Sequence, residues 1–483
     1  MIRLALLVVF LLGIAIYAWK DWYKSLCGLI ILMAVIEHPD MPKSLFGIQG
    51  LNPWNLVLLI IILAWLTSRG REGLSWDMPR NVSILLLLYL TVVVVGFFRM
   101  YFGDGMLPMA SEGGRLVPIG KGALISEYLI NNIKWAIPGL LLYDGCRDLS
   151  RFQWGLVSLL AIYFLLGLQV IKWMPLGEVG SGAALSDRSL KILVNEIGYH
   201  RVNLSMMLAG ASWAVLATRG LTRNQFQSVL VVLVSFSIVF AQALTGGRAG
   251  YGTWAAVGLI LCVIRWRKLL LLAPFIALAA VLLVPSAVER MTQGFTAESR
   301  DTNALIREPE LTSTDDGPDL YTVTAGRNIA WRYVVPKILE SPFVGYGRNG
   351  MWSTGLVVFL LEKFGESFPH PHNAYLELLL DNGLLGFLAV ISFYIVVLRN
   401  SLSLFRSSDS PVYTAIGGVS LALLLALLIA SVGSQSFYPR EGAVGMWCAY
   451  GLMFRVYVDR SREGKMPASG EGASFTNPWR VAV

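Results

Sequence analysis

Long apolar runs recur from one end of this sequence to the other, and they constrain the fold more than any other feature. A backbone inside hydrocarbon must pair its own amide groups, so such runs form helices. Thirteen runs approach the length that spans a membrane, at about 3–18, 24–37, 53–67, 82–98, 126–143, 152–171, 202–217, 228–245, 251–264, 269–285, 375–398, 412–432 and 441–457. Because the second run is short and can pair with the first, we predict an all-α polytopic membrane protein with about 12 or 13 transmembrane helices.

Charged side chains are scarce in this chain. They make up 14% of its residues, against about 25% in soluble domains, so lipid is the expected solvent and membrane lipids are expected partners. The net charge of +8 would suggest nucleic acid in a soluble protein. In a membrane protein, excess Lys and Arg mark cytoplasmic loops, and we expect no nucleic acid partner. The four cysteines form no CxxC pair, which indicates neither a metal site nor a disulfide framework.

Basic residues alternate along the loops between the predicted helices. Counted with the thirteen runs, six basic segments fall on one side of the membrane, and the positive-inside bias makes that side cytoplasmic. They contain Arg69, Arg71 and Arg80; Arg147 and Arg151; Arg219 and Arg223; Arg265, Arg267 and Lys268; Arg399 and Arg406; and Arg460, Arg462 and Lys465. The other side, periplasmic or extracellular, then holds the long segment 286–374 and the tight turn Gly246–Gly250.

Four parts of the chain follow from this topology. They are 1–285 with N-terminal membrane helices, 286–374 as a large periplasmic loop, 375–457 with C-terminal membrane helices, and 458–483 as a disordered cytoplasmic tail.

The large loop changes character along its length. It is polar at 289–328, where a solvated loop is expected and its fold is left open. Apolar spacing then predicts a short helix from Arg327 to Leu339, and a second helix around 351–363.

Arg248 lies between glycines in the tight turn Gly246–Gly250. Two readings are open: an interfacial anchor, or a functional group, since ionisable residues at membrane level are often functional. A guanidinium grips a phosphate with two parallel hydrogen bonds, and glycines would let backbone amides approach an anion.

His370 and His372 flank Pro371, and Asn373 follows as a candidate cap for a helix that begins near Ala374. One interpretation is a loop-to-helix junction with exposed histidines. The functional alternative is a neutral imidazole that acts as a general base at the membrane surface. A metal site is a third option, disfavoured because no matching ligand cluster accompanies the pair.

Glu377 and Asp381 lie four and eight residues after Asn373, on one face of the predicted helix. Acidic groups facing lipid are costly, so this face should point into the bundle or a wet cavity. They are expected either to support the site or to join helices. Other polar groups on the same predicted side are Arg327, Arg332, Lys337 and Arg348 in the loop, and Tyr438, Arg440 and Glu441 after it. Topology places Arg248, Arg327 and His372 on one membrane face.

Three motifs in order resemble those of the O-antigen ligase and polymerase superfamily. They are Thr245–Gly250; Gly326–Trp331, leading through Ser341–Gly347; and His372–Glu377, followed by Asp381–Gly386. The resemblance covers roughly residues 200–455, and the N-terminal third is similar only in spanning the membrane.

This resemblance implies glycan transfer from an undecaprenyl-diphosphate carrier to a hydroxyl acceptor at the periplasmic face of the bacterial inner membrane. It implies no metal, nucleotide sugar or other cofactor. His372 would be the catalytic base, and Arg248 and Arg327 would bind the leaving diphosphate. His370 has the weaker claim, because the motif histidine is the one that precedes Asn373.

The motifs do not name the acceptor, which can be a lipid, a glycan or a protein. Ligase, polymerase and protein O-glycosylating activities therefore stay open. A transporter is the alternative of another class and would show paired broken helices, and a non-catalytic assembly factor is a third. We see no inverted repeat in the sequence.

Overall fold

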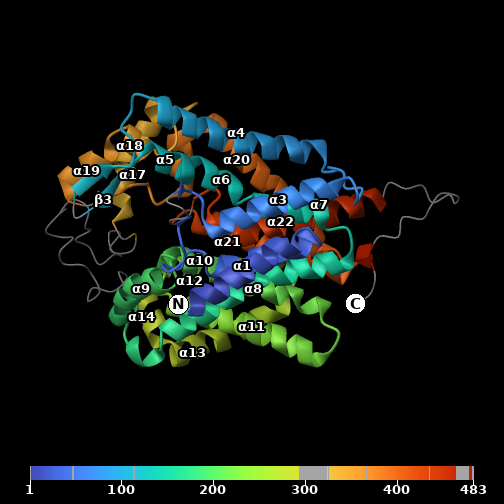
Figure 1. The fold of residues 1–483 in the computed structure, drawn as a ribbon. Coiled ribbons are helices and arrows are strands. Elements are labelled where there is room, and N and C mark those ends of the chain that lie inside the picture. Colours follow the sequence, from blue (N-terminus) through green and yellow to red (C-terminus); the bar gives the residue numbers. More distant parts are fainter. Residues whose placement is uncertain are drawn as a thin grey trace.

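Helices make up nearly all of the regular structure. The computed structural model describes residues 2–45, 48–112, 115–292, 324, 326–365, 367–433, 436–463 and 478–480. Within these residues the only strands form two small antiparallel hairpins, β1 (Ser44–Leu45) with β2 (Ile48–Gln49) and β3 (Met109–Glu112) with β4 (Arg115–Pro118). The prediction of an all-α polytopic membrane protein is confirmed, and Figure 1 shows the helices bundled roughly side by side.

Six helices in the described residues are long and apolar enough to cross a membrane. They are α4 (Arg80–Phe102), α8 (Leu149–Trp173), α10 (Arg201–Ala217, extended by a 3-10 turn to Leu221), α11 (Gln225–Leu244), α20 (Ala374–Arg406) and α21 (Pro411–Ala430). Four shorter apolar helices coincide with other predicted runs: Leu6–Tyr17 in α1 (Ile2–Tyr17), Trp22–Ala34, α3 (Pro53–Arg69) and α12 (Arg248–Ile264). By length and composition the described helices give six or seven crossings, fewer than the 12 or 13 predicted.

The remaining predicted runs are interrupted or more polar. Run 126–143 is divided into a π-helical turn, Ser126–Ile130, and the helices α6 (Asn131–Lys134) and α7 (Ile137–Gly145). Run 269–285 bends by 104° between α13 (Ala273–Leu283) and α14 (Pro285–Thr292). The last run forms α22 (Val444–Glu463), which carries the buried charges Arg455 and Asp459.

The helices α10 and α21 lie at the centre of the bundle. Small residues let them approach closely, because a Cβ at Gly210 would lie only 2.6 Å from the Cβ of Ala426. Outer helices instead expose large apolar side chains such as Phe226 of α11 and Leu282 of α13. This distribution suits a bundle whose periphery faces lipid.

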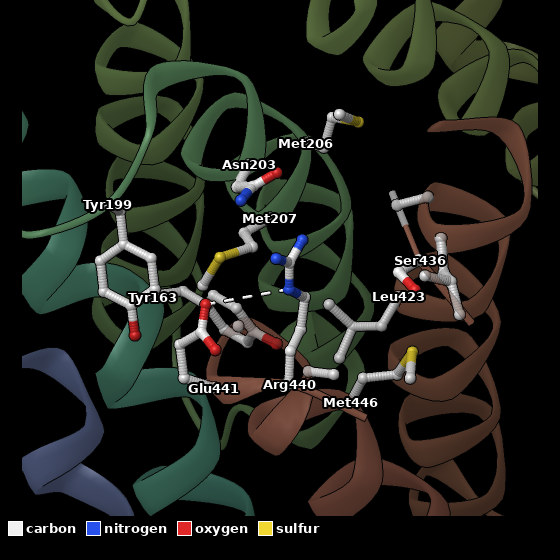
Figure 2. A pocket seen from close by; sticks show the side chains of 14 residues that line it. Tyr163, Tyr199, Asn203, Met206, Met207, Leu423, Ser436, Arg440, Glu441 and Met446 are labelled. Atoms are coloured by element: carbon white, nitrogen blue, oxygen red, sulfur yellow. Dashed lines mark ion pairs between the residues drawn. The ribbon is translucent and has the colours of Figure 1, made fainter. Parts of the chain in front are cut away.

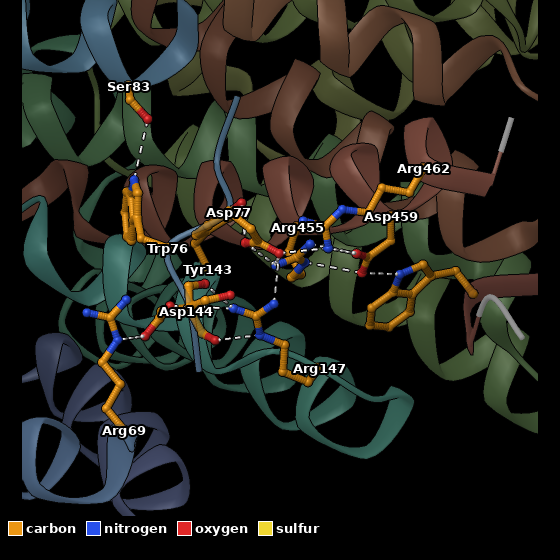
Figure 3. Close-up of polar contacts among 12 residues, drawn as sticks. Arg69, Trp76, Asp77, Ser83, Tyr143, Asp144, Arg147, Arg455, Asp459 and Arg462 are labelled. Carbon is orange, nitrogen blue, oxygen red and sulfur yellow. Dashed lines mark hydrogen bonds and ion pairs between the residues drawn. The ribbon is translucent and has the colours of Figure 1, made fainter. Parts of the chain in front are cut away.

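Basic segments of the sequence meet at one end of the bundle. Asp77, between α3 and α4, pairs with Arg147 at 3.0 Å and with Arg455 at 2.7 Å. Arg462 reaches the same carboxylate at 2.8 Å, as Figure 3 shows. We call the segments 69–80, 144–151, 405–411 and 455–462 the basic end. Several segments that the charge pattern placed on one side therefore do meet, and the compartment that this end faces stays a prediction.

The C-terminal segment is partly ordered against the basic end. Although the tail was predicted to begin at 458, α22 continues to Glu463. Residues 464–477 lie outside the described residues. Pro478–Arg480 then form a 3-10 turn in which the indole of Trp479 is fully buried, donates to Asp459 at 3.0 Å and packs on Phe152.

The opposite end of the bundle, which we call the histidine end, carries segment 326–373. Most of the polar stretch 289–328 lies outside the described residues. The first predicted short helix is confirmed as α17 (Arg327–Glu340), with Pro336 inside it. The second is split by Gly355 into α18 (Gly350–Ser353) and α19 (Leu356–Phe364).

Candidate active site

Helix α20 is broken at Gly383, two residues after Asp381 of the acidic pair. Gly383 has φ 59° and ψ −166°, which a residue with a Cβ rarely adopts, and a Cβ there would collide with the backbone of Phe343. Segment 342–347 fills the break: the amides of Leu384 and Leu385 donate to the carbonyls of Pro342 and Phe343. The backbone groups freed by the break are thus paired again, as burial requires.

Arg348 joins this inserted segment to the acidic face of α20. Its guanidinium donates to Glu377 at 2.7 Å and to Asp381 at 3.0 Å, and it lies 3.6 Å from the ring centre of Tyr438. Burial alone would lower the pKa of Arg348, but the neighbouring carboxylates raise it above its usual value. Glu377 and Asp381 face into the bundle, as predicted, and they anchor the segment that precedes α18.

The histidine motif forms a tight, strained turn at the start of α20. Asn373 caps the helix as predicted, with its side chain accepting from the amides of Tyr375 and Leu376. His372 has φ 53°, a left-handed conformation uncommon for a residue other than glycine. Such strain persists only where the surroundings impose it, and it concentrates at functional sites.

The two histidines of the motif have different surroundings. His370 Nδ1 accepts from the backbone amide of His372 at 3.3 Å, so it supports the turn. His372 Nδ1 is buried, and no group among the described residues bonds it. The indole of Trp331 donates to the carbonyl of Pro371 at 2.8 Å. Because Trp331 lies one turn after Arg327 on α17, this bond fixes the helix of Arg327 against the turn of His372.

The imidazole of His372 is neutral over the physiological pH range. Burial, followed by the influence of His370, Arg327 and His200, lowers its pKa to about 3. A neutral imidazole can accept a proton, whereas an imidazolium cannot. Burial also lowers the pKa of His370 and of His200.

Arg248 and Arg327 come together across the end of α21. Arg248 is the first residue of α12 and lies within electrostatic range of Arg327. A Cβ placed on Gly433 would lie 3.4 Å from the Cβ of Ala249 and 3.6 Å from Nη1 of Arg327. Gly433 therefore leaves only a narrow gap between the Arg327 guanidinium and the start of α12.

The glycines of the Thr245–Gly250 turn pack against α10. A Cβ on Gly247 would lie 2.6 Å from the Cβ of Ser205, and Ser205 also donates to the carbonyl of Gly247 at 3.1 Å. The amide of Gly246 is bonded to Ala243 and that of Gly247 to Thr245. These contacts do not support the expected approach of the two amides to an anion, and they leave the guanidinium of Arg248 as the candidate anion-binding group of the turn.

Three further residues of this end carry no sequence motif that would have indicated them. His200 caps α10 and lies within electrostatic range of His372. The charges of Arg290 and Arg248 lower the pKa of Arg201, after burial as the larger cause. The charge of Arg290 also lowers the pKa of Arg248. The helix-cap position of His200 was the one available signal. Among the described residues, no group of three or more His, Cys, Asp or Glu side chains is arranged to hold a metal ion.

The fold and this site define a polytopic helical membrane protein with a histidine and several arginines gathered at one end of its bundle. Residues 229–391 match the family model described as O-antigen ligase. This match supports the O-antigen ligase and polymerase superfamily for the segment, and with it a membrane glycosyltransferase of the ligase or polymerase type, a class that acts on a lipid-linked glycan and an acceptor. A comparison of the chain with curated proteins finds no match.

Proposed function

We propose that this protein transfers a glycan from an undecaprenyl-diphosphate carrier to a hydroxyl acceptor at the periplasmic face of the bacterial inner membrane. The reaction belongs to the biosynthesis of a surface polysaccharide, such as lipopolysaccharide or exopolysaccharide, and needs neither a metal nor another cofactor. The acceptor is a lipid, a growing glycan or a protein hydroxyl. Ligase activity is our first choice, with polymerase and protein O-oligosaccharyltransferase activities as the alternatives within the superfamily.

The chemistry is a direct displacement at the anomeric carbon of the glycan. The acceptor oxygen forms the new C–O bond while its proton passes to the neutral imidazole of His372. The bond from the anomeric carbon to the diphosphate breaks, and the carrier leaves as undecaprenyl diphosphate. Arg248 and Arg327 stabilise the charge that develops on the departing oxygen. Displacement from the face opposite the leaving group inverts the anomeric configuration.

One contact carries the proposal: the bond from Trp331 to the carbonyl of Pro371 at 2.8 Å. It holds a proton acceptor, His372, beside a helix whose first residue, Arg327, can bind an anion. A base next to a cation for the leaving group is the pair that this displacement requires. A transporter is not favoured by the helix break at Gly383, because segment 342–347 fills that break and pairs its backbone groups.

The test replaces His372 by asparagine. Asparagine tolerates the left-handed backbone of this position, so His372→Asn removes the imidazole and keeps the turn. Purified full-length protein is given an undecaprenyl-diphosphate-linked glycan and a candidate acceptor, and the coupled product is quantified. We expect transfer to fall by a factor of about 10²–10⁴, as for loss of a general base.

His38→Asn is the matched control, since His38 is a surface histidine that hydrogen-bonds the amide of Asp40. It should transfer glycan at the wild-type rate. Undiminished transfer by a folded His372→Asn protein would refute the role of His372 as the base.

A further inference from the structure

A pocket opens next to the histidine turn but contains none of its residues. About 560 Å³ of empty space, open solvent at the mouth included, lies among its lining residues. Its walls come from α8, α10, α21 and the segment 436–446. Figure 2 shows the side chains of Asn203, Arg440 and Glu441 directed into this space.

The pocket adjoins the proposed reaction centre. Tyr199 lines it, and the next residue, His200, lies within electrostatic range of His372. Arg440 lines it as well and influences both His200 and His370. A ligand seated here can therefore extend a reactive group toward the histidine turn.

The charge of the pocket differs from that of the arginine site. Arg440 and Glu441 lie 3.9 Å apart, and together they are neutral. At the arginine site, by contrast, burial and then the charges of Arg290 and Arg327 lower the pKa of Arg248. A guanidinium donates, a carboxylate accepts, and the amide of Asn203 does both. That combination matches hydroxyl groups, each of which is a donor and an acceptor.

The rest of the lining is apolar. The rings of Tyr163 and Tyr199 and the side chains of Met206 and Met446 are almost fully buried around it. Such surfaces suit the C–H faces of a sugar ring better than a charged group. An isoprenoid chain would need access from lipid. The pocket lies between α10 and α21, and 72% and 78% of the apolar stretches of these helices are buried inside the bundle.

The position of the pocket in the chain separates it from the donor site. Every lining residue falls outside 229–391, the segment that matches the family model, whereas Arg248, Arg327 and His372 fall inside it. We propose that this pocket is the acceptor subsite and that it binds a neutral, hydroxyl-bearing sugar unit with its reactive hydroxyl directed to His372. This inference rests on the proposed function and names the place where its second substrate binds.

Two substitutions test the polar side of the pocket. Glu441→Gln removes the charge while keeping the shape, and Asn203→Leu removes the amide. Glu362→Gln, on the exposed surface of α19, is the matched control for the charge change. Full-length protein is assayed with an undecaprenyl-diphosphate-linked glycan and three acceptors in turn: lipid A–core oligosaccharide, a second lipid-linked glycan, and a serine-containing peptide. Loss of one hydrogen bond should raise the KM for the acceptor about tenfold, with the KM for the donor unchanged.

A labelling experiment gives a second measurement that does not depend on activity of a variant. The four native cysteines are buried, so Met207→Cys places a single accessible thiol in the pocket. We expect the acceptor used by the wild type to slow labelling of this thiol by a water-soluble maleimide, and the lipid-linked donor to leave the rate unchanged.

The outcomes separate the two proposals. A wild-type protein that consumes no lipid-linked donor would refute the proposed function, and the acceptor subsite with it. If the wild type transfers glycan but the pocket variants keep the acceptor KM, or change the donor KM instead, only the subsite is refuted. Protection of Met207→Cys by the donor alone, or by neither substrate, would refute the subsite as well.

Discussion

Both ends of this bundle are rich in arginine, yet the arginines are used differently. At the basic end, Arg147, Arg455 and Arg462 converge on the carboxylate of Asp77. Burial alone would raise the pKa of that carboxyl, but the hydrogen bonds and charge of Arg455, followed by Arg147, hold it below its usual value. Cations and carboxylates are balanced there, and the network joins the loop before α4 to α7 and α22.

At the histidine end, burial and then the charges of Arg290 and Arg327 lower the pKa of Arg248. Bringing like charges together is costly in a folded protein unless an anion compensates. Burial lowers the pKa of Arg327, the direction expected of a cation removed from water. The comparison separates arginines that pair with carboxylates and hold the fold at the basic end from Arg248 and Arg327, which we propose bind the diphosphate of the donor.

Replacing one arginine at each end by lysine gives the largest expected contrast. Lysine keeps the charge but loses the two-pronged geometry with which arginine grips a phosphate. Arg248→Lys should lower kcat/KM for the donor by a factor of about 10²–10³, the usual cost of losing one group that stabilises a developing oxyanion. The measurement is steady-state transfer by purified protein.

The partner variant at the basic end is Arg462→Lys, where the arginine is half-exposed. An exposed ion pair contributes about 0–1 kcal/mol, so transfer should stay at the wild-type rate. Equal losses in both variants would show that the two arginine sites do not differ in the way proposed.

The converse experiment removes a carboxylate from the balanced network. Asp77→Asn removes one of the two carboxylates that pair with buried Arg455, the other being Asp459 at 2.6 Å, and breaking a buried pair costs up to about 3–5 kcal/mol. We expect a lower unfolding temperature in detergent, read by intrinsic fluorescence, with kcat per folded molecule retained. Loss of kcat in protein that unfolds at the wild-type temperature would contradict the structural role of the basic end.

Much of this architecture follows from local sequence. Apolar runs give α4, α8, α11 and α21 closely, and Asn373 marks the start of α20 because its side chain can accept from the next turn. The break at Gly383 could not be predicted from local sequence. The apolar run continues through Gly383, and the groups that pair the broken backbone come from segment 342–347, about 40 residues earlier.

In the candidate site, too, some features follow from the sequence and others depend on contacts between distant segments. The predicted topology placed Arg248, Arg327 and His372 at one end, because that placement depends on the alternation of basic loops along the chain. The other cations near these three residues are brought there by contacts between distant segments of the chain. Arg201 and Arg290 could therefore not be predicted from the sequence. The packing of Gly247 on Ser205 of α10 could not be predicted for the same reason, because Ser205 lies 42 residues earlier in the chain.

A smaller effect is expected from narrowing the gap beside the Arg327 guanidinium. Gly433→Ala adds a methyl group at ordinary contact distance, 3.4 Å from the Ala249 Cβ and 3.6 Å from Arg327 Nη1, and should be tolerated. Gly433→Leu inserts a longer side chain that displaces Arg327 from α12, and a displacement of about 1 Å can cost up to about 10²-fold in rate. Transfer rates and the unfolding temperature of both variants are compared, and equal rates would show that the position of Arg327 beside α12 does not affect transfer.

The smallest expected effect is an absence of change with pH in the free protein. With its pKa lowered to about 3 by burial, then by His370, Arg327 and His200, the His372 imidazole stays neutral from pH 8 down to about pH 5. The pH profile of kcat/KM should therefore be flat where an ordinary histidine, with a pKa of about 6.5, would lose activity.

Donor binding changes this balance, because a diphosphate beside Arg327 compensates the cations that disfavour protonation of His372. The acid limb of kcat, which reports the enzyme–substrate complex, should lie at higher pH than that of kcat/KM. His38→Asn should leave both profiles unaltered. A kcat/KM that falls tenfold per pH unit below about 6.5 would mean that the imidazole of His372 is protonated like an ordinary histidine. In that case the arginines of the histidine end would not lower the pKa of the base.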